Sequence, residues 1–166
     1  PQLICLAGGG YGGYATLMGL GRDPALFRCG IAWSSIPDLR ELKDEVNWWL
    51  DDDLRNSNEQ YTLAMLLGDA DKDKALLREN SPRHLPARIS APLLMAHGYT
   101  DHIVPMSDAR ALFDAIHKTN AHALWMEYGE EGHDWVLPQT HVDFWQQSEK
   151  FLDRHIGKNS AATKKE

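Results

Sequence analysis

Short apolar runs and amphipathic segments alternate along this chain. Four apolar runs predict buried strands, at residues 3–7, 29–34, 92–98 and 123–128. Helix-compatible segments lie between and after these runs, at residues 14–21, 39–50, 59–67, 72–79, 107–119 and 141–156. This alternation predicts an α/β fold, in which a parallel sheet of about four strands carries helices on both faces.

Residues that interrupt or begin regular structure support these boundaries. Pro24 follows the end of the first predicted helix, and Ser107 is the expected N-cap of the helix after the third strand. Prolines within residues 81–86 indicate a connector. Because the last residues are polar, we expect one domain over residues 1–156 and a disordered polar tail over residues 157–166.

A glycine cluster follows the first predicted strand and leads directly into a helix. Its residues are Gly8-Gly9-Gly10-Tyr11-Gly12-Gly13. A strand, a tight turn of small residues and a helix form the layout of a nucleophile elbow, in which the motif G-x-S-x-G holds a serine above a parallel sheet. Gly10 occupies the position of that serine, and glycine has no side chain that attacks a substrate. The pattern therefore predicts the architecture of a serine hydrolase without its nucleophile.

Two other interpretations of the glycine cluster stay open at this point. One is a simple tight turn between a strand and a helix. The other is a dinucleotide-binding loop, because Gly8, Gly10 and Gly13 match the motif G-x-G-x-x-G. That motif calls for an acidic residue about 20 positions further on. Asp38 is the candidate, but it stands next to Pro37 instead of at a strand end.

The loops after the third and fourth predicted strands carry the residues that separate these interpretations. Asp101 follows the third strand, and His133 follows the fourth. In α/β-hydrolases the nucleophile, the acid and the histidine come in this chain order. We therefore predict that position 10, Asp101 and His133 are the three members of a catalytic triad.

Composition narrows the range of functions. With 166 residues, of which 43% are hydrophobic, the chain suits one domain with a substantial core. A net charge of −7 without a basic stripe argues against a nucleic-acid partner, and no apolar run is long enough to span a membrane. No signal peptide opens the chain, which favours the cytoplasm. Cys5 and Cys29 both lie in apolar runs, so we expect two buried thiols.

Several further motifs accompany the glycine cluster. They are Asp23-Pro24-Ala25-Leu26-Phe27-Arg28, Ser81-Pro82, Pro92-Leu93-Leu94, His97-Gly98 with Asp101 and Val104-Pro105, and Glu131-Gly132-His133. With these motifs the chain resembles the C-terminal half of the catalytic domain of the prolyl oligopeptidase family of serine peptidases. The resemblance is strongest to acylaminoacyl-peptidase and dipeptidyl-peptidase-like members, and it extends from the first strand to Ile156. The first half of the hydrolase sheet and the propeller domain of such enzymes are not in this sequence.

The resemblance implies a peptidase that hydrolyses oligopeptide, acyl-peptide or dipeptidyl-peptide bonds without a cofactor or metal. His133 would take the proton of the nucleophile, and Asp101 would orient the imidazole. The Tyr11 N–H would be one oxyanion donor, while the second donor of the family comes from an upstream loop. Because Gly10 has no hydroxyl, we expect essentially no turnover from this chain.

Two candidate substrate contacts follow the second predicted strand. We hypothesise that Trp48 or Trp49 lines the pocket for the residue before the scissile bond, and plain core packing is the alternative. The acidic run at residues 51–53 is interpreted as a solvated loop, with the binding of a substrate N-terminus as the alternative.

Other polar residues are interpreted as structural. His97, Asp101 and His102 form too common a combination to predict a metal site, and His97 is interpreted as a hydrogen-bonded structural histidine. Ser34 and Ser35 follow a different strand from the glycine cluster, so neither is expected to replace the nucleophile.

The resemblance also predicts how the chain associates. In the whole fold the first strand seen here is central and pairs on both sides, whereas here its outer edge is unpaired. We expect the partners to be a peptide substrate and either the missing N-terminal half of the same protein or a second copy bound through this edge.

Overall fold

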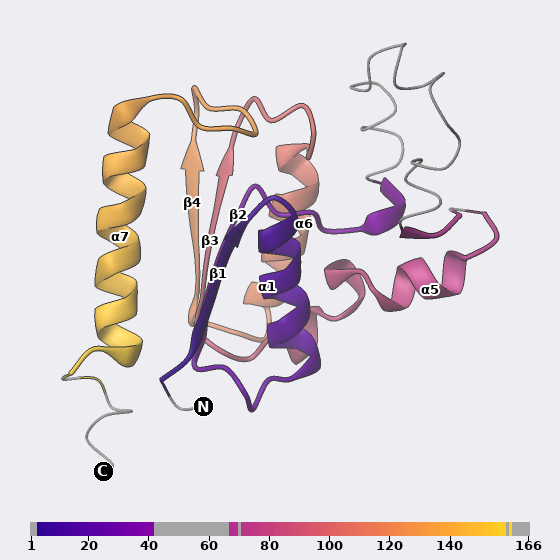
Figure 1. Cartoon of the computed structure of the whole chain (residues 1–166), viewed down its shortest axis with the longest axis horizontal. Coiled ribbons are helices and arrows are strands. Elements are labelled where there is room, and N and C mark those ends of the chain that lie inside the picture. The colour runs from indigo at the N-terminus through magenta and orange to yellow at the C-terminus, as the bar shows by residue number, and fades with distance from the viewer. Residues whose placement is uncertain (1–2, 42–66, 70, 159, 161–166) are drawn as a thin grey trace.

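Four parallel strands form one sheet, in the order β1-β2-β3-β4 (Figure 1). They are β1 (Cys5–Gly9), β2 (Cys29–Trp33), β3 (Leu93–Gly98) and β4 (Ala123–Tyr128). The computed structural model describes residues 3–41, 67–69, 71–158 and 160. All four strands lie where the apolar runs predict them, and β1 extends through Gly9 into the glycine cluster.

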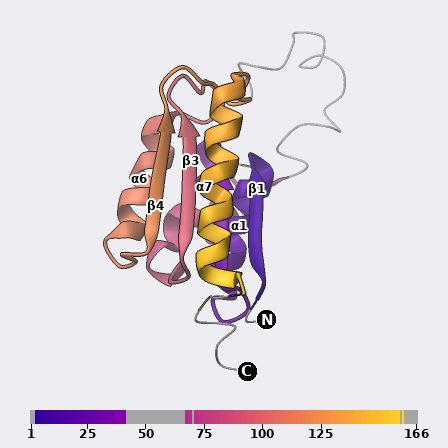
Figure 2. The same cartoon turned by 90° about the vertical axis from the view of Figure 1, so that its left-hand side faces the viewer.

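Helices cover both faces of this sheet (Figures 1 and 2). α1 (Tyr11–Arg22) and α6 (Met106–His117) lie on one face, and α7 (Pro138–Ile156) lies on the other. α5 (Lys74–Glu79) and the short 3-10 helices η2 (Pro82–His84) and η3 (Pro86–Arg88) precede β3 along the chain. The predicted fold class is thereby confirmed. None of the described helices is both long enough and apolar enough to cross a lipid bilayer.

Apolar side chains form a core on each face of the sheet. The core on the side of α1 and α6 contains Leu17, Leu20, Leu93, Met95, Leu112, Phe113 and Ile116. The core on the side of α7 contains Ile31, Leu94, Ala96, Phe144 and Phe151. Because both faces are covered, β3 is buried along its whole length. This burial explains why its sequence is a continuous apolar run without polar alternation.

Small residues let α1 lie directly against the end of β1. A Cβ atom on Gly8 would collide with the backbone of Gly12, and one on Gly13 would collide with the hydroxyl of Ser35. Strand and helix therefore approach at backbone distance, which only glycine permits at these positions.

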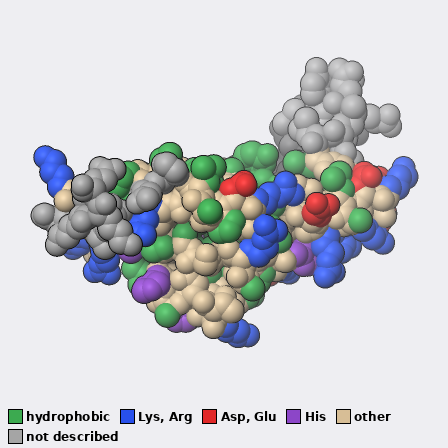
Figure 3. Space-filling model, turned by 90° about the horizontal axis from the view of Figure 1, so that it is seen from below, with side chains coloured by type: hydrophobic (Ala, Val, Ile, Leu, Met, Phe, Trp, Pro, Cys, Tyr) green, Lys and Arg blue, Asp and Glu red, His purple; other side chains and the backbone are tan. Residues whose placement is uncertain are grey.

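The predicted site residues lie at one end of the sheet. Figure 3 views the molecule from the end at which the strands begin, where charged side chains of both signs lie among hydrophobic ones. The glycine cluster and the loops that follow β3 and β4 lie at the opposite end, where the strands terminate (Figure 1). The predicted site residues therefore gather at one end of the sheet.

The structure corrects four helix starts, of which α1 begins at Tyr11 and α5 at Lys74. α6 begins at Met106 with Pro105 in the N-cap position, so Ser107 lies inside the first turn and does not cap the helix. α7 begins at Pro138, upstream of the predicted start at residue 141. Proline is favoured at the first helical position, because an N–H there has no intrahelical acceptor and its absence costs no hydrogen bond.

Parts of the predicted organisation lie outside the described residues. Most of the helices expected at residues 39–50 and 59–67 belong to this group, although residues 39–41 and 67 are described and helical. Most of the expected tail at residues 157–166 is not described either, so the domain boundary stays a prediction.

The prediction of two buried thiols is wrong. Cys5 of β1 and Cys29 of β2 are paired in the strand register, with 4.6 Å between their Cα atoms, and they form a disulfide bond. The apolar pattern placed each cysteine in a strand. It carried no information on register, and register is what brings the two sulfur atoms together.

Candidate active site

Gly10 forms the turn between β1 and α1 in a backbone conformation that favours glycine. Its φ is 56° and its ψ is −119°, and it is the N-cap residue of α1. The Gly10 N–H donates to the carbonyl of Trp33 at 3.0 Å, and the Gly10 carbonyl accepts from the N–H of Tyr14 at 3.0 Å. This positive φ at a strand-to-helix turn is the strained geometry of a nucleophile elbow.

The imidazole of His133 lies beside this turn. A Cβ atom built on Gly10 would lie 3.4 Å from Nε2 of His133. A side chain at position 10 would therefore touch the nitrogen that serves as the general base in a Ser-His-Asp triad.

Asp101 holds the other side of the same imidazole. Its Oδ2 atom lies 2.9 Å from Nδ1 of His133, and its Oδ1 atom accepts hydrogen bonds from the N–H groups of Ile103 and Val104 at 2.9 and 2.8 Å. The Asp101 side chain is completely buried. A carboxylate fixed by backbone donors in this way keeps the imidazole in one orientation.

His97 adds a further hydrogen bond to the Asp101 carboxylate. Its Nε2 atom lies 3.2 Å from Oδ2 of Asp101 and 2.9 Å from the carbonyl oxygen of Val104. Since both neighbours are acceptors, Nε2 of His97 carries a proton and donates to them. The predicted role of a hydrogen-bonded structural histidine agrees with this geometry.

Burial and hydrogen bonding act in opposite directions on the pKa values of this pair. Burial alone would raise the pKa of Asp101. The hydrogen bonds from His133, His97 and the Val104 N–H outweigh burial and hold the pKa of this carboxyl well below its usual range. For His133, the hydrogen bond to Asp101 raises the pKa above its ordinary value, although burial opposes the change.

Glu131 is a buried carboxylate that organises the loop carrying His133. Its two oxygen atoms accept hydrogen bonds from the N–H groups of Val136 and Leu137, both at 2.9 Å. Burial alone would raise the pKa of Glu131, but its hydrogen bonds outweigh burial and lower it. The sequence showed Glu131 only as part of a motif, because the loop must fold back on itself before the carboxylate meets these donors.

Ser34 is a second residue whose role the sequence did not reveal. Its hydroxyl donates to the backbone carbonyl of His133 at 3.0 Å. The hydroxyl is therefore directed at the histidine backbone. No short motif signals this contact, because Ser34 follows β2 and His133 lies in the loop after β4.

The structure thus brings Gly10, Asp101 and His133 together, with Tyr11 as the first residue of α1. The first N–H groups of a helix have no intrahelical acceptor, so the Tyr11 N–H is suited to donate to an oxyanion. Trp48 and Trp49, and the acidic run at residues 51–53, lie outside the described residues. These pocket assignments stay predictions.

His102 does not join this group, because the loop leaves it exposed. In the described part of the chain, no group of three or more His, Cys, Asp or Glu side chains is arranged to hold a metal ion.

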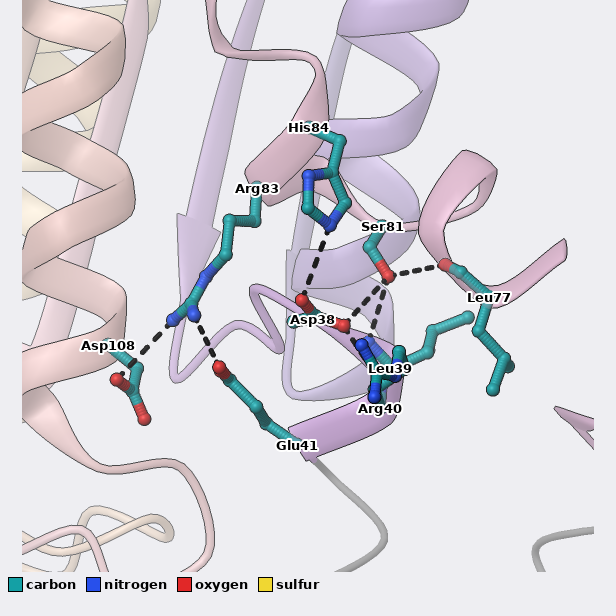
Figure 4. Close-up of polar contacts among 9 residues, drawn as sticks. All are labelled: Asp38, Leu39, Arg40, Glu41, Leu77, Ser81, Arg83, His84 and Asp108. Carbon is teal, nitrogen blue, oxygen red and sulfur yellow. Dashed lines mark hydrogen bonds and ion pairs between the residues drawn. The ribbon is translucent and has the colours of Figure 1, made fainter. Parts of the chain in front are cut away.

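Asp38, the acidic residue that the dinucleotide interpretation requires, belongs to another network (Figure 4). Its Oδ1 atom accepts from the hydroxyl of Ser81 at 3.3 Å, and its Oδ2 atom lies 3.5 Å from Nε2 of His84. In a separate group of contacts, Arg83 forms ion pairs with Glu41 and Asp108. These contacts tie the segment after β2 to η2 and α6, and they give Asp38 a structural role.

Comparison with known proteins decides the family. The sequence model described as the prolyl oligopeptidase family matches residues 1–159. The chain belongs to the prolyl oligopeptidase family. The resemblance carried by its motifs is thereby confirmed.

Two curated relatives come from distant organisms. The chain is 31% identical to dipeptidyl aminopeptidase BIII of Pseudoxanthomonas mexicana over 157 residues, which are 93% of this chain and 22% of the relative. It is 25% identical to dipeptidyl peptidase family member 6 of Caenorhabditis elegans, over 93% of this chain and 20% of the relative. The chain therefore spans about a fifth of the length of these two relatives.

Solved structures of similar fold include two peptidases. A puromycin-hydrolysing peptidase of Mycobacterium tuberculosis has a TM-score of 0.80 at 21% identity, covering 95% of this chain and 23% of its own length. An acylaminoacyl peptidase of Pyrococcus horikoshii has a TM-score of 0.77 at 19% identity, covering 96% of this chain and 25% of its own length. The chain has the fold of the C-terminal half of an α/β-hydrolase.

Proposed function

We propose that this chain is the C-terminal part of a serine-peptidase catalytic domain whose nucleophile position holds Gly10. The observation that carries the proposal is the geometry at position 10. A Cβ atom there would lie 3.4 Å from Nε2 of His133, whose Nδ1 atom lies 2.9 Å from Asp101. With a serine at this position the arrangement would be that of a Ser-Asp-His triad, which cleaves peptide bonds through an acyl-enzyme.

Each residue has one role in this proposal. His133 would take the proton of the attacking hydroxyl and later return it to the leaving amine, while Asp101 would hold the imidazole and stabilise its charged form. The Tyr11 N–H would donate to the oxyanion of the tetrahedral intermediate. A second oxyanion donor would come from a part of the hydrolase domain upstream of this sequence.

Relatives suggest the class of substrate. Their names describe dipeptidyl aminopeptidases and acylaminoacyl peptidases. We therefore propose a peptide substrate that is cleaved near its N-terminus. Removing a triad member leaves roughly 10³- to 10⁴-fold catalysis over water from the oxyanion hole and binding. Because Gly10 has no hydroxyl, we expect essentially no turnover with Gly10 in place.

Labelling with a fluorophosphonate tests this proposal directly. We expect no labelling of the chain with Gly10 and labelling of the Gly10→Ser variant, because only the variant has a hydroxyl beside Nε2 of His133. A serine in this backbone conformation costs about 1–3 kcal/mol, so a thermal melt must show that the variant is folded.

The matched control is Gly10→Ala, which carries the same backbone strain without a hydroxyl. It should fold like Gly10→Ser and remain unlabelled. A folded Gly10→Ser protein that also remains unlabelled would contradict a triad that is complete within this chain.

A second candidate function is a non-catalytic domain that binds peptides or acts as a scaffold on the same fold. The observation in its favour is Gly10 itself, because a glycine there removes the chemistry and leaves the rest of the site in place. Calorimetric titration with a peptide distinguishes the two. Binding by the natural chain, with no turnover in Gly10→Ser, would favour the binding domain.

A further inference from the structure

Ser34 holds an unusual backbone conformation at the end of β2. Its φ is 46°, and no other described non-glycine residue has a positive φ. Its side chain is buried, with 1% of its surface exposed, and its N–H donates to the carbonyl of Ala96 in β3 at 3.0 Å. A conformation of this kind costs about 1–3 kcal/mol and persists where surrounding contacts require it. Such strain calls for a reason in the structure around it.

The hydroxyl of Ser34 supplies that reason. It donates to the backbone carbonyl of His133 at 3.0 Å. The neighbouring Ser35 is equally buried, yet its hydroxyl has no hydrogen-bond partner among the described residues. The two adjacent buried serines therefore differ in two respects: only Ser34 has a positive φ, and only the Ser34 hydroxyl contacts the His133 loop.

Other contacts hold this loop on either side of His133. Before it, the N–H and hydroxyl of Thr100 both donate to the carbonyl of Glu131 at 2.9 Å. After it, the Glu131 carboxylate accepts from the N–H groups of Val136 and Leu137. The Ser34 hydroxyl acts between these points, on the peptide group of His133 itself.

We propose that Ser34 is a positioning residue that holds the His133 backbone so that the imidazole reaches both Asp101 and position 10. The inference rests on the proposed function, because it gives Ser34 a role in the same site. Without the hydroxyl, the carbonyl of His133 loses its donor and the loop relaxes. The contact of Nδ1 with Asp101 then loosens, and Nε2 moves away from position 10.

The first experiment uses the chain with Gly10 and requires no enzymatic activity. The pKa of His133 is followed by NMR in Ser34→Ala, Ser34→Gly and Ser35→Ala, with the His133 signal assigned by its loss in His133→Asn. The charged groups that act on this imidazole are Asp101 and Asp134. We expect both Ser34 variants to lower the pKa of His133 and Ser35→Ala to leave it unchanged.

The pair of Ser34 variants separates positioning from folding. Ser34→Ala keeps the strained φ, whereas Ser34→Gly adopts it at little cost. Ser34→Gly should therefore melt at a higher temperature than Ser34→Ala, while both lower the pKa of His133 alike. If the pKa of His133 changes only in the less stable variant, the positioning role is wrong.

The second experiment places the same changes in the Gly10→Ser background and measures the rate of fluorophosphonate labelling. We expect the two Ser34 variants to label about three- to tenfold more slowly, the factor that one net hydrogen bond supplies, and Ser35→Ala to label at the unchanged rate. Labelling of all variants at one rate, with an unchanged pKa of His133, would overturn the role of Ser34. If Gly10→Ser does not label but the Ser34 variants lower the pKa of His133, the proposed function fails and the positioning role stands.

Discussion

Asp101 and His133 form a pair whose two pKa values move apart in the folded protein. The Asp101 carboxyl accepts from two backbone N–H groups and from the imidazoles of His133 and His97. These hydrogen bonds lower the pKa of Asp101 against the effect of burial, and the bond to Asp101 raises the pKa of His133. The pair therefore links the site to the stability of the fold.

The signs of the two shifts define a pH window. The lowered pKa of the Asp101 carboxyl stabilises the fold at pH values above its pKa in the unfolded chain, which is about 4. This contribution is lost as the pH falls through the pKa of the folded state. The raised pKa of His133 stabilises the fold at pH values below its pKa in the unfolded chain, which is about 6.5. This contribution is lost as the pH rises through the pKa of the folded state. The pair therefore stabilises most between about pH 4 and pH 6.5.

The variant Asp101→Asn tests this window. We expect it to lower the pKa of His133, because burial then acts without the neighbouring charge. The loss of stability in urea unfolding should be largest between about pH 4 and pH 6.5. Asp134→Asn is the control, because Asp134 is exposed and has a weaker effect on the pKa of His133 than Asp101 has. An equal pKa change in both variants would contradict the role of the Asp101 hydrogen bond.

At the scale of elements, the pairing of β1 with β2 fixes the positions of two site residues that follow these strands. Gly10 follows the end of β1, and Ser34 follows the end of β2. The Gly10 N–H continues the ladder by donating to Trp33, and the Cys5–Cys29 disulfide joins the same strands at their beginnings. A change that loosens this strand pair should therefore act on both residues.

Removal of the disulfide tests the strand pair. The bond closes a loop with a sequence separation of 24 residues. Loss of such a constraint on the unfolded chain lowers the free energy of unfolding by about 3 kcal/mol. The double variant Cys5→Ala/Cys29→Ala should therefore unfold at a lower urea concentration. Reduction with dithiothreitol should lower the stability of the natural chain but leave the double variant unchanged. Equal stability of oxidised and reduced natural chain would contradict this prediction.

At the scale of the whole molecule, β1 is an edge strand of the described sheet. The resemblance to the family predicts that the same strand is central in the whole fold. It pairs with β2 on one side, and no described strand pairs with its other side. Leu3 and Ile4, just before it, are 45% and 47% exposed. The chain spans about a fifth of the length of the two curated relatives. In isolation, an unpaired edge favours association with a second copy.

Sedimentation velocity at several concentrations tests this association. We expect the natural chain to self-associate and Ala7→Lys to weaken the association, because Ala7 is exposed on β1 and a charge on an edge strand opposes pairing. Leu124→Lys is the matched control, since Leu124 is 43% exposed on β4, at the opposite edge of the sheet. A natural chain that stays a compact monomer would contradict the prediction, as would equal effects of the two lysines.

Much of the fold was predictable because its elements are signalled locally. The strands that became β3 and β4 were mostly apolar runs, and the glycine cluster marked the turn at Gly10. Helix starts were harder to predict, because a cap depends on the geometry of the preceding loop. Pro105 takes the N-cap position of α6 in place of Ser107, and α7 starts at Pro138.

The sequence by itself determined the α/β class, the family and the chain order of position 10, Asp101 and His133. These properties reside in residue types and their order, which short motifs record. Only the tertiary structure decided that Cys5 bonds to Cys29, that Asp38 belongs to a structural network and that Ser34 reaches the backbone of His133. Each of these contacts depends on strand register or on a loop conformation, and neither is encoded in a local pattern.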